Sequence, residues 1–146
     1  MAARPPRVEE TGNGGVRGGV TFDTGAFISI ERRRERARKV FERLREQDIL
    51  ITAPLPVIGE WWRGRTDWRE SILASVRVEP LTLALVKLAG QALASAPPAR
   101  KGRGPSVVDA IVMASAASRG DVVYTSDVDD LERLQSFFPE VRVLSV

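Results

Sequence analysis

The sequence predicts an α/β protein with a central, mostly parallel sheet covered by helices on both faces. Three observations predict this class. Short apolar runs rich in β-branched residues alternate with longer segments in which apolar residues recur at spacings of three and four. Two of the short runs, Val20–Phe22 and Val122–Thr125, are almost wholly apolar, which is typical of central strands in a covered sheet. A chain of 146 residues is long enough for one domain with a proper core.

The first strand and the two helices after it follow from apolar patterning. Val20–Asp23 reads as a short buried strand, and a turn at Thr24-Gly25 separates it from a helix that begins at Ala26–Ile30. The next helix is amphipathic. Its apolar positions are Ala37, Val40, Phe41 and Leu44.

The middle of the chain is expected to supply two more strands. Ile49–Thr52 is short, apolar and β-branched, and the prolines that follow it open a helix running through Trp62. Asp67–Ser75 is expected to be helical. Val76–Val78 is expected to be a brief strand.

The second half begins with a strongly helical segment. Leu81–Ser95 is expected to be a helix, ended by the two prolines after it. A serine N-cap and a following glycine bound the helix Ser106–Ser118. Asp121–Thr125 is predicted as a strand, Val128–Phe137 as a helix and Val141–Leu144 as the last strand.

Composition excludes several classes of protein. The chain has no cysteine, so disulfides and thiolate zinc sites are excluded, and a reducing, cytoplasmic location fits. No apolar stretch approaches the ~20 residues of a membrane span. Met1–Gly19 is rich in Gly, Pro, Arg and Glu and lacks the apolar core of a signal peptide. We expect these residues to form a disordered arm and residues 20–146 to form the folded domain.

Four acidic residues lie at the ends of apolar runs: Asp23, Glu60, Asp109 and Asp127. The central strands place two of them at the carboxyl edge of the sheet, where such folds bind ligands. Helices beside these strands carry the other two. Buried charge is commonly stabilised by cations, and the chain has neither histidine nor cysteine. The cluster is therefore expected to bind a hard, oxygen-ligated metal, Mg²⁺ or Mn²⁺.

Each of these acids also has a structural interpretation. Asp109 follows Ser106 at the spacing of a capping box. Asp127 is a candidate helix N-cap with Asp130 at its third helical position, and Asp23 is a candidate turn residue. Glu60 has a solvent-facing alternative. Convergence of all four on one pocket favours the metal site.

Basic and aromatic residues give weaker signals. The net charge is +3, and arginines crowd into Glu31–Arg45, where interleaved glutamates indicate a salt-bridged helix face. The loop Arg100–Arg103 is open to two interpretations, phosphate contact and solvation. Of the adjacent Trp61 and Trp62, one is expected in the core and the other at a partner surface. The helix pair Ala26–Leu44 is expected to expose apolar surface to that partner.

The acidic segments resemble the PIN-domain ribonucleases, and within them the VapC-type toxins of bacterial toxin–antitoxin pairs. The resemblance covers Val20 to the C-terminus. It is carried by Thr-Phe-Asp23-Thr-Gly-Ala-Phe-Ile-Ser-Ile, Glu60-Trp-Trp-Arg-Gly, Ser-Val-Val-Asp109-Ala-Ile-Val-Met-Ala-Ser-Ala and Val-Tyr-Thr-Ser-Asp127-Val-Asp-Asp130-Leu.

The resemblance implies a three-layer α/β/α PIN-like domain that binds Mg²⁺ or Mn²⁺ and cleaves single-stranded RNA. It also implies homodimerisation and inhibition by a cognate antitoxin protein. Asp23 and Asp109 would be the principal metal ligands. Glu60 and Asp127 would complete the catalytic quartet, and Asp130 matches a further acid that some members carry.

The expected mechanism is metal-assisted hydrolysis of an RNA phosphodiester, in which one or two Mg²⁺ ions activate water and stabilise the leaving oxygen. Arg63 or Arg103 would hold backbone phosphates. A haloacid-dehalogenase-like phosphatase would need an acid at Gly25, and a receiver domain would need an acid beside Asp23, at Thr24. The remaining alternative is a degenerate PIN domain that binds RNA or an antitoxin without cleavage.

Overall fold

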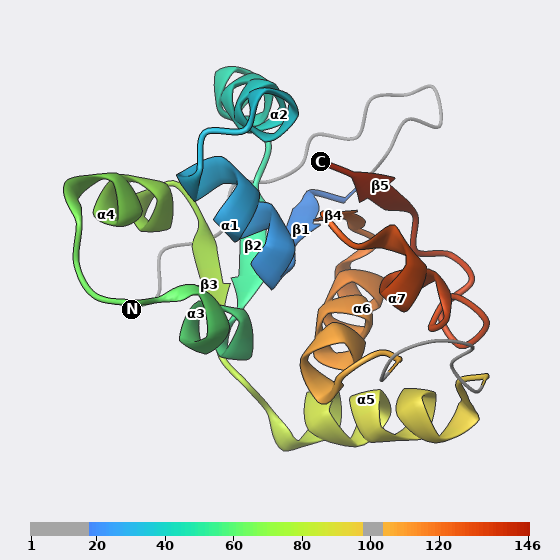
Figure 1. Cartoon of the computed structure of the whole chain (residues 1–146). Helices are drawn as coiled ribbons and strands as arrows, with labels where there is room; N and C mark the ends of the chain where they lie inside the picture. Colours follow the sequence, from blue (N-terminus) through green and yellow to red (C-terminus); the bar gives the residue numbers. More distant parts are fainter. Residues whose placement is uncertain (1–17, 98–103) are drawn as a thin grey trace.

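The computed structural model describes residues 18–97 and 104–146, which form a five-stranded sheet and seven helices (Figure 1). The strand order is β3-β2-β1-β4-β5, and every neighbouring pair is parallel. The strands are β1 (Val20–Phe22), β2 (Ile51–Pro54), β3 (Arg77–Glu79), β4 (Val122–Thr125) and β5 (Val143–Ser145). The expected parallel sheet is confirmed, with β1 at its centre.

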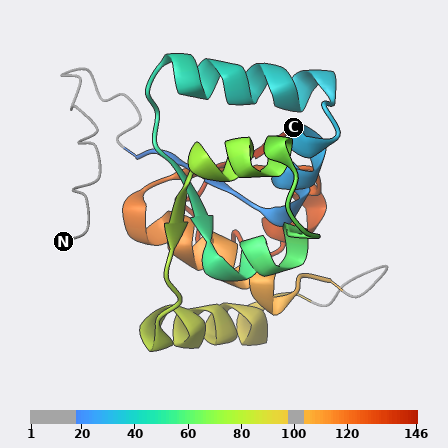
Figure 2. The ribbon, with the colours of Figure 1, turned by 90° about the vertical axis from the view of Figure 1, so that its left-hand side faces the viewer.

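Helices cover both faces of this sheet, which confirms the three-layer architecture. They are α1 (Thr24–Glu31), α2 (Glu35–Glu46), α3 (Leu55–Trp61), α4 (Asp67–Ala74), α5 (Leu83–Ser95), α6 (Val107–Arg119) and α7 (Val128–Glu132). Figure 2 shows α2 and α5 on opposite sides of the molecule, with the strands between them. In the part of the chain that the structure describes, no helix is long and apolar enough to cross a membrane.

Alternate residues of β1 point into different layers. The Phe22 ring meets Phe27 of α1 edge-on at 5.6 Å and Phe41 of α2 at 6.4 Å. Thr21 points the other way, where its hydroxyl oxygen accepts a 2.8 Å hydrogen bond from Arg119 at the end of α6. The period of two in an extended strand therefore fixes the two faces of the domain.

The apolar face of α1 and α2 is used inside the fold. Its residues are buried: Ala26, Phe27, Ile30, Ala37, Phe41 and Leu44. Trp61 is 2% exposed and stacks on Phe27 at 4.8 Å, and Trp62 is half-buried against Trp61. The expected core tryptophan is confirmed. The expectation that this helix pair exposes apolar surface to a partner is wrong, because the sheet and α3 cover it.

A partly buried charged network lies under the sheet, and no local sequence pattern indicates it. Arg119 pairs with Glu79, which ends β3, and with Asp121, whose Oδ2 lies 3.0 Å from Nε of Arg119. Ser115 donates to Glu79 at 2.9 Å, and Thr21 donates to Asp121 at 2.8 Å. These contacts tie α6 to both halves of the sheet.

Several element boundaries differ from the predicted ones. The first strand ends at Phe22, and the predicted turn after Asp23 is already the first turn of α1. The final helix is shorter than predicted and ends at Glu132. Gly19, expected in the arm, is buried, and a Cβ there would lie 2.3 Å from the carbonyl oxygen of Leu50. Residues 1–17 of the arm and the Arg100–Arg103 loop lie outside the described residues.

Candidate active site

The candidate site lies at the carboxyl edge of the sheet, where β1 and β4 run side by side. Asp23 directly follows β1, and Asp127 follows β4 by two residues. Asp109 is in the first turn of α6, and Glu60 is in the last turn of α3. The predicted adjacency of the two central strands is confirmed. After β1 the chain moves toward β2 on one side, while β4 lies on the other, so this edge is a point where strand order reverses.

Asp23 is the most buried of the acids, at 6% exposure. Its Oδ1 accepts the backbone N–H of Ala26 at 2.8 Å, which makes it the N-cap of α1, and its Oδ2 accepts the hydroxyl of Thr125. Burial raises the pKa of Asp23 to about 6, against the lowering effect of these two hydrogen bonds. The charges of Asp109 and Asp127 contribute to this raised pKa. Asp23 therefore caps the N-terminus of α1, and its surroundings disfavour its ionised form.

Asp109 also has a structural role. Its Oδ2 accepts the backbone N–H of Ser106 at 2.8 Å, and the Ser106 hydroxyl accepts the backbone N–H of Asp109 at 3.1 Å. The capping box expected from the spacing is therefore present. Burial raises the pKa of Asp109, the bonds with Ser106 lower it, and the charges of Glu60 and Asp127 raise it again. The same carboxylate is a helix cap and a member of the acidic cluster.

The remaining acids are more accessible. Glu60 is exposed and accepts the Thr24 hydroxyl at 2.6 Å, which joins α3 to the start of α1. Asp127 is exposed, and its backbone N–H donates to the Thr125 hydroxyl oxygen at 2.9 Å. Asp127 occupies the N-cap position of α7, as expected, and Asp130 is the third residue of that helix, but within the described chain the Asp127 side chain makes no capping hydrogen bond. Burial raises the pKa of Asp130, and the neighbouring Asp127 raises it further.

Thr125 and Gly25 hold this edge together. The Thr125 hydroxyl donates to Asp23 and accepts from Asp127, so one side chain positions the acids that follow both central strands. A Cβ on Gly25 would lie 2.0 Å from the hydroxyl oxygen of Ser126. A larger residue here would force the Ser126 side chain to move, so glycine suits this close approach of α1 to the end of β4. The sequence indicates only that Thr125 ends a strand, because its partner Asp23 lies 102 residues away in the chain.

The five acids form one electrostatic neighbourhood. Their mutual repulsion links Asp23 to Asp109 and Asp127, and Asp109 to Glu60. All the available donors are carboxylate and hydroxyl oxygens, which suit Mg²⁺ or Mn²⁺, and a cation would relieve the repulsion. Among residues 18–97 and 104–146, no three acids are close enough to form a metal's ligand set. The donor chemistry of these acids fits a hard cation.

The sequence pattern of the PIN domain matches residues 20–136 of this chain. The match spans most of the molecule and all four acids of the predicted quartet. The protein therefore belongs to the PIN domain family. No curated protein sequence matches the chain.

Three of the solved structures that share this fold illustrate the likeness. VapBC2 from Rickettsia felis, bound to a DNA fragment of its promoter, gives a TM-score of 0.65 at 12% identity, covering 87% of this chain and 98% of that one. FitAcB from Neisseria gonorrhoeae gives 0.61 at 18% identity, covering 86% and 96%. The sarcin–ricin-loop-cleaving toxin VapC20 from Mycobacterium tuberculosis gives 0.56 at 22% identity, covering 77% and 92%. At these identities the likeness establishes the fold.

Proposed function

We propose that this PIN domain is a metal-dependent endoribonuclease that hydrolyses RNA phosphodiesters and acts as the toxin of a toxin–antitoxin pair. One observation carries the proposal. Asp23, Glu60, Asp109 and Asp127 come from separate segments and lie near one edge of the sheet, where the charges of neighbouring acids disfavour ionisation of the buried Asp23 and of the partly buried Asp109. Perturbed carboxylates gathered at one edge are typical of catalytic sites.

Asp23 and Asp109 would be the principal metal ligands, because hydrogen bonds from Ala26 and Ser106 already fix their orientation. Glu60 and Asp127 would complete the set, with Asp130 behind Asp127. When bound, Mg²⁺ would supply activation of water and neutralisation of the leaving oxygen. The protein's own part would be to hold the acids through Thr125 and to bind substrate phosphates through the exposed Arg63, which follows α3.

The test is cleavage of single-stranded RNA with Mg²⁺, with Mn²⁺ and with EDTA. Asp23→Asn and Asp109→Asn each remove one charge with little change of shape, and each should abolish metal-dependent cleavage. The same variants should show a smaller rise in melting temperature on addition of Mg²⁺ than the wild type does. If both variants cleave RNA at the wild-type rate, the acids are structural and the proposed function is wrong.

A second candidate is a degenerate PIN domain that binds RNA or an antitoxin without cleaving. It is favoured by the finding that no three described acids form a ligand set. The two candidates differ in one measurement. Binding of RNA with no cleavage in any divalent metal would support the non-cleaving domain.

An antitoxin partner follows from the proposed role as a toxin, and the structural neighbour VapC20 is itself a toxin. We propose in addition that the chain forms a homodimer, for which α5 offers surface. Leu83 is 72% exposed and Leu81 43% exposed, beside a groove of about 430 Å³ lined in part by Pro80, Leu85 and Leu88. Co-purification with the product of an adjacent small reading frame would support the antitoxin.

A further inference from the structure

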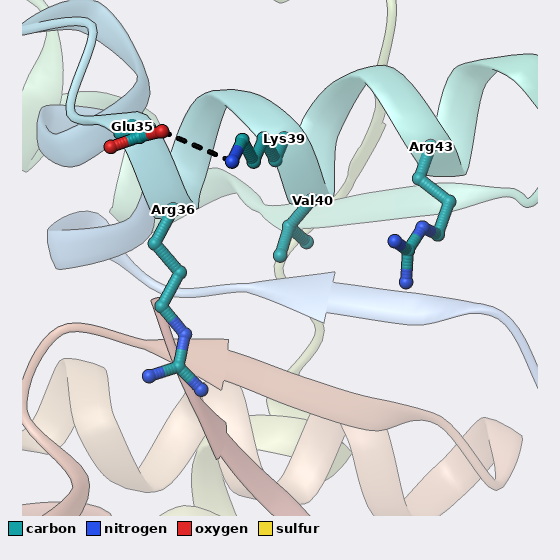
Figure 3. Close-up of a pocket in the computed structure, with 5 residues that line it drawn as sticks. All are labelled: Glu35, Arg36, Lys39, Val40 and Arg43. Atoms are coloured by element: carbon teal, nitrogen blue, oxygen red, sulfur yellow. Dashed lines mark ion pairs between the residues drawn. The ribbon is translucent and has the colours of Figure 1, made fainter.

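One flank of α2 forms a groove that the acidic site does not use. Glu35, Arg36, Lys39, Val40 and Arg43 line it, and its volume is about 410 Å³ (Figure 3). The core-facing residues of α2 are Ala37, Phe41 and Leu44. At 100° per residue, Arg36 and Arg43 lie on the same side of the helix, about 10.5 Å apart along its axis. Figure 3 shows both side chains extending from α2 on this side, with Val40 between them.

The groove carries uncompensated positive charge. Lys39 pairs with Glu35 at 3.0 Å, so these two charges offset each other. Within the described residues no acid lies within ion-pair distance of Arg36 or Arg43. Two guanidinium groups are therefore available to a ligand.

The opposite flank of α2 differs. There Arg38 pairs with Glu42 at 3.2 Å, and the Arg45 guanidinium lies 5.6 Å from the centre of the Phe41 ring. These arginines have partners within their own helix. Both flanks of α2 therefore carry two arginines, but in the part of the chain that the structure describes only those on the groove side lack a partner. Substitution of Arg38 and Arg45 is for this reason a control for substitution of Arg36 and Arg43.

The groove has a defined position relative to the acids. Phe22 of β1 meets both Phe41 of α2 and Tyr124 of β4, so α2 covers the face shared by the two central strands. In Figure 3 the Arg36 end of the groove lies toward the end of β1 at which the chain passes into α1. Asp23 stands at that junction. A strand of anionic polymer lying along the groove would therefore lead toward the acidic edge.

We propose that this groove binds the phosphate backbone of single-stranded RNA on one side of the scissile position; the inference rests on the proposed ribonuclease function. Guanidinium groups bind phosphate oxygens through paired N–H donors. Because Arg36 and Arg43 are two helical turns apart, they would contact different phosphates. Val40 is too small to stack a base, so binding should be independent of base sequence.

The experiment measures binding of a fluorescein-labelled, mixed-sequence single-stranded RNA by anisotropy in EDTA, where metal-dependent cleavage does not occur. The test variant is Arg36→Gln/Arg43→Gln. Its matched control, Arg38→Gln/Arg45→Gln, removes the same charge from the other flank. Loss of two phosphate contacts should weaken binding about 25-fold near 0.1 M salt and make the slope of log K against log salt less negative by about 1.4. The control should change affinity by a much smaller factor.

A third variant, Arg36→Lys/Arg43→Lys, keeps the charge and should retain the wild-type salt slope. Melting temperatures verify that each variant is folded, which is expected because these arginines are exposed. If both double glutamine variants weaken RNA binding equally, the proposed role of the groove is wrong, because the effect would then be one of overall charge. Labelled polyglutamate is measured in the same way, as a probe for an acidic protein segment. If Arg36→Gln/Arg43→Gln keeps the wild-type affinity for RNA but loses binding of polyglutamate, the RNA proposal is wrong and the groove binds an acidic protein segment.

The groove and the proposed function fail in distinguishable ways. If RNA binds through Arg36 and Arg43 but is not cleaved in any divalent metal, RNA binding by the groove is supported and the proposed ribonuclease activity is wrong. Normal cleavage together with unchanged RNA affinity in the Arg36→Gln/Arg43→Gln variant would leave the ribonuclease in place and overturn the groove. Absence of RNA binding by the wild type would overturn the groove.

Discussion

At the scale of single residues, the carboxylates at the sheet edge combine two roles that are usually separate. Asp23 caps α1 and Asp109 caps α6, yet both belong to one repulsive cluster. A capping carboxylate gains from the partial positive charge of the helix N-terminus. This favourable interaction partly offsets the repulsion from neighbouring acids, which disfavours the ionised form of each carboxylate. The helix ends therefore position the acids and also lower the cost of holding them.

The pKa of Asp23 predicts a pH dependence of stability. The folded-state pKa is raised from 3.8 to about 6, so the folded protein binds more protons than the unfolded chain between these values. Stability should fall as pH rises from 3.8 to about 6, by about 3 kcal/mol for this group, and then level off. Asp23→Asn removes this contribution. In urea unfolding without metal, wild type and variant should diverge between these pH values; parallel curves would contradict the assignment.

A side chain at Gly25 should lower the stability of the fold. Gly25→Ala places a methyl group against Ser126 and is expected to cost about 1–3 kcal/mol, as overpacking does. The double variant Gly25→Ala/Ser126→Ala should recover part of the loss. Gly90→Ala is the control, because no described atom lies within 4 Å of its Cβ and α5 is helical there. It should gain up to about 1 kcal/mol. Thermal unfolding of the three variants decides this.

At the scale of elements, α6 is held by charge as well as by packing. Its middle is apolar and buried, and its last residue, Arg119, lies between Glu79 and Asp121 beneath the sheet. The arrangement joins β3, α6 and the start of β4. Paired buried charges add little net stability, but loss of one partner leaves the others desolvated and unpaired.

Arg119→Met should therefore be strongly destabilising. We expect a loss of about 3 kcal/mol, since Asp121 would stay buried without its cation, whereas Glu79 would keep its ion pair with Arg77 at 3.5 Å. Arg38→Met removes an exposed pair with Glu42 from α2 and should change stability by less than about 1 kcal/mol. The midpoints of urea unfolding give both values. A loss at Arg119 as small as the one at Arg38 would show that the network is solvated.

At the scale of the whole molecule, apolar surface is distributed unevenly. The α1–α2 side closes on the sheet and on Trp61, whereas α5 packs on α6 and leaves Leu81 and Leu83 exposed. Exposed leucines beside an apolar groove are typical of interaction surfaces.

If α5 forms the homodimer contact, Leu83→Lys should shift the protein to a monomer. Because Leu83 is 72% exposed, the substitution should leave the fold of the single subunit intact. Leu55→Lys, at 49% exposure on α3, is the control and should leave the mass unchanged. Sedimentation or light scattering at micromolar concentration measures this. A dimer that persists in Leu83→Lys would place the contact elsewhere, and a monomeric wild type would remove the proposal.

The sequence alone was sufficient for the strand–helix order, the parallel sheet and the edge where Asp23 and Asp127 meet. These follow from local patterns and from the fact that parallel strands end at the same side. The capping box at Asp109 was equally local. Other features required residues far apart in the chain to come together: the Arg119 network, the link of Thr125 to Asp23, and the covering of the α1–α2 face. The raised pKa of Asp23 belongs with these, because burial and neighbouring charge exist only once the chain is folded.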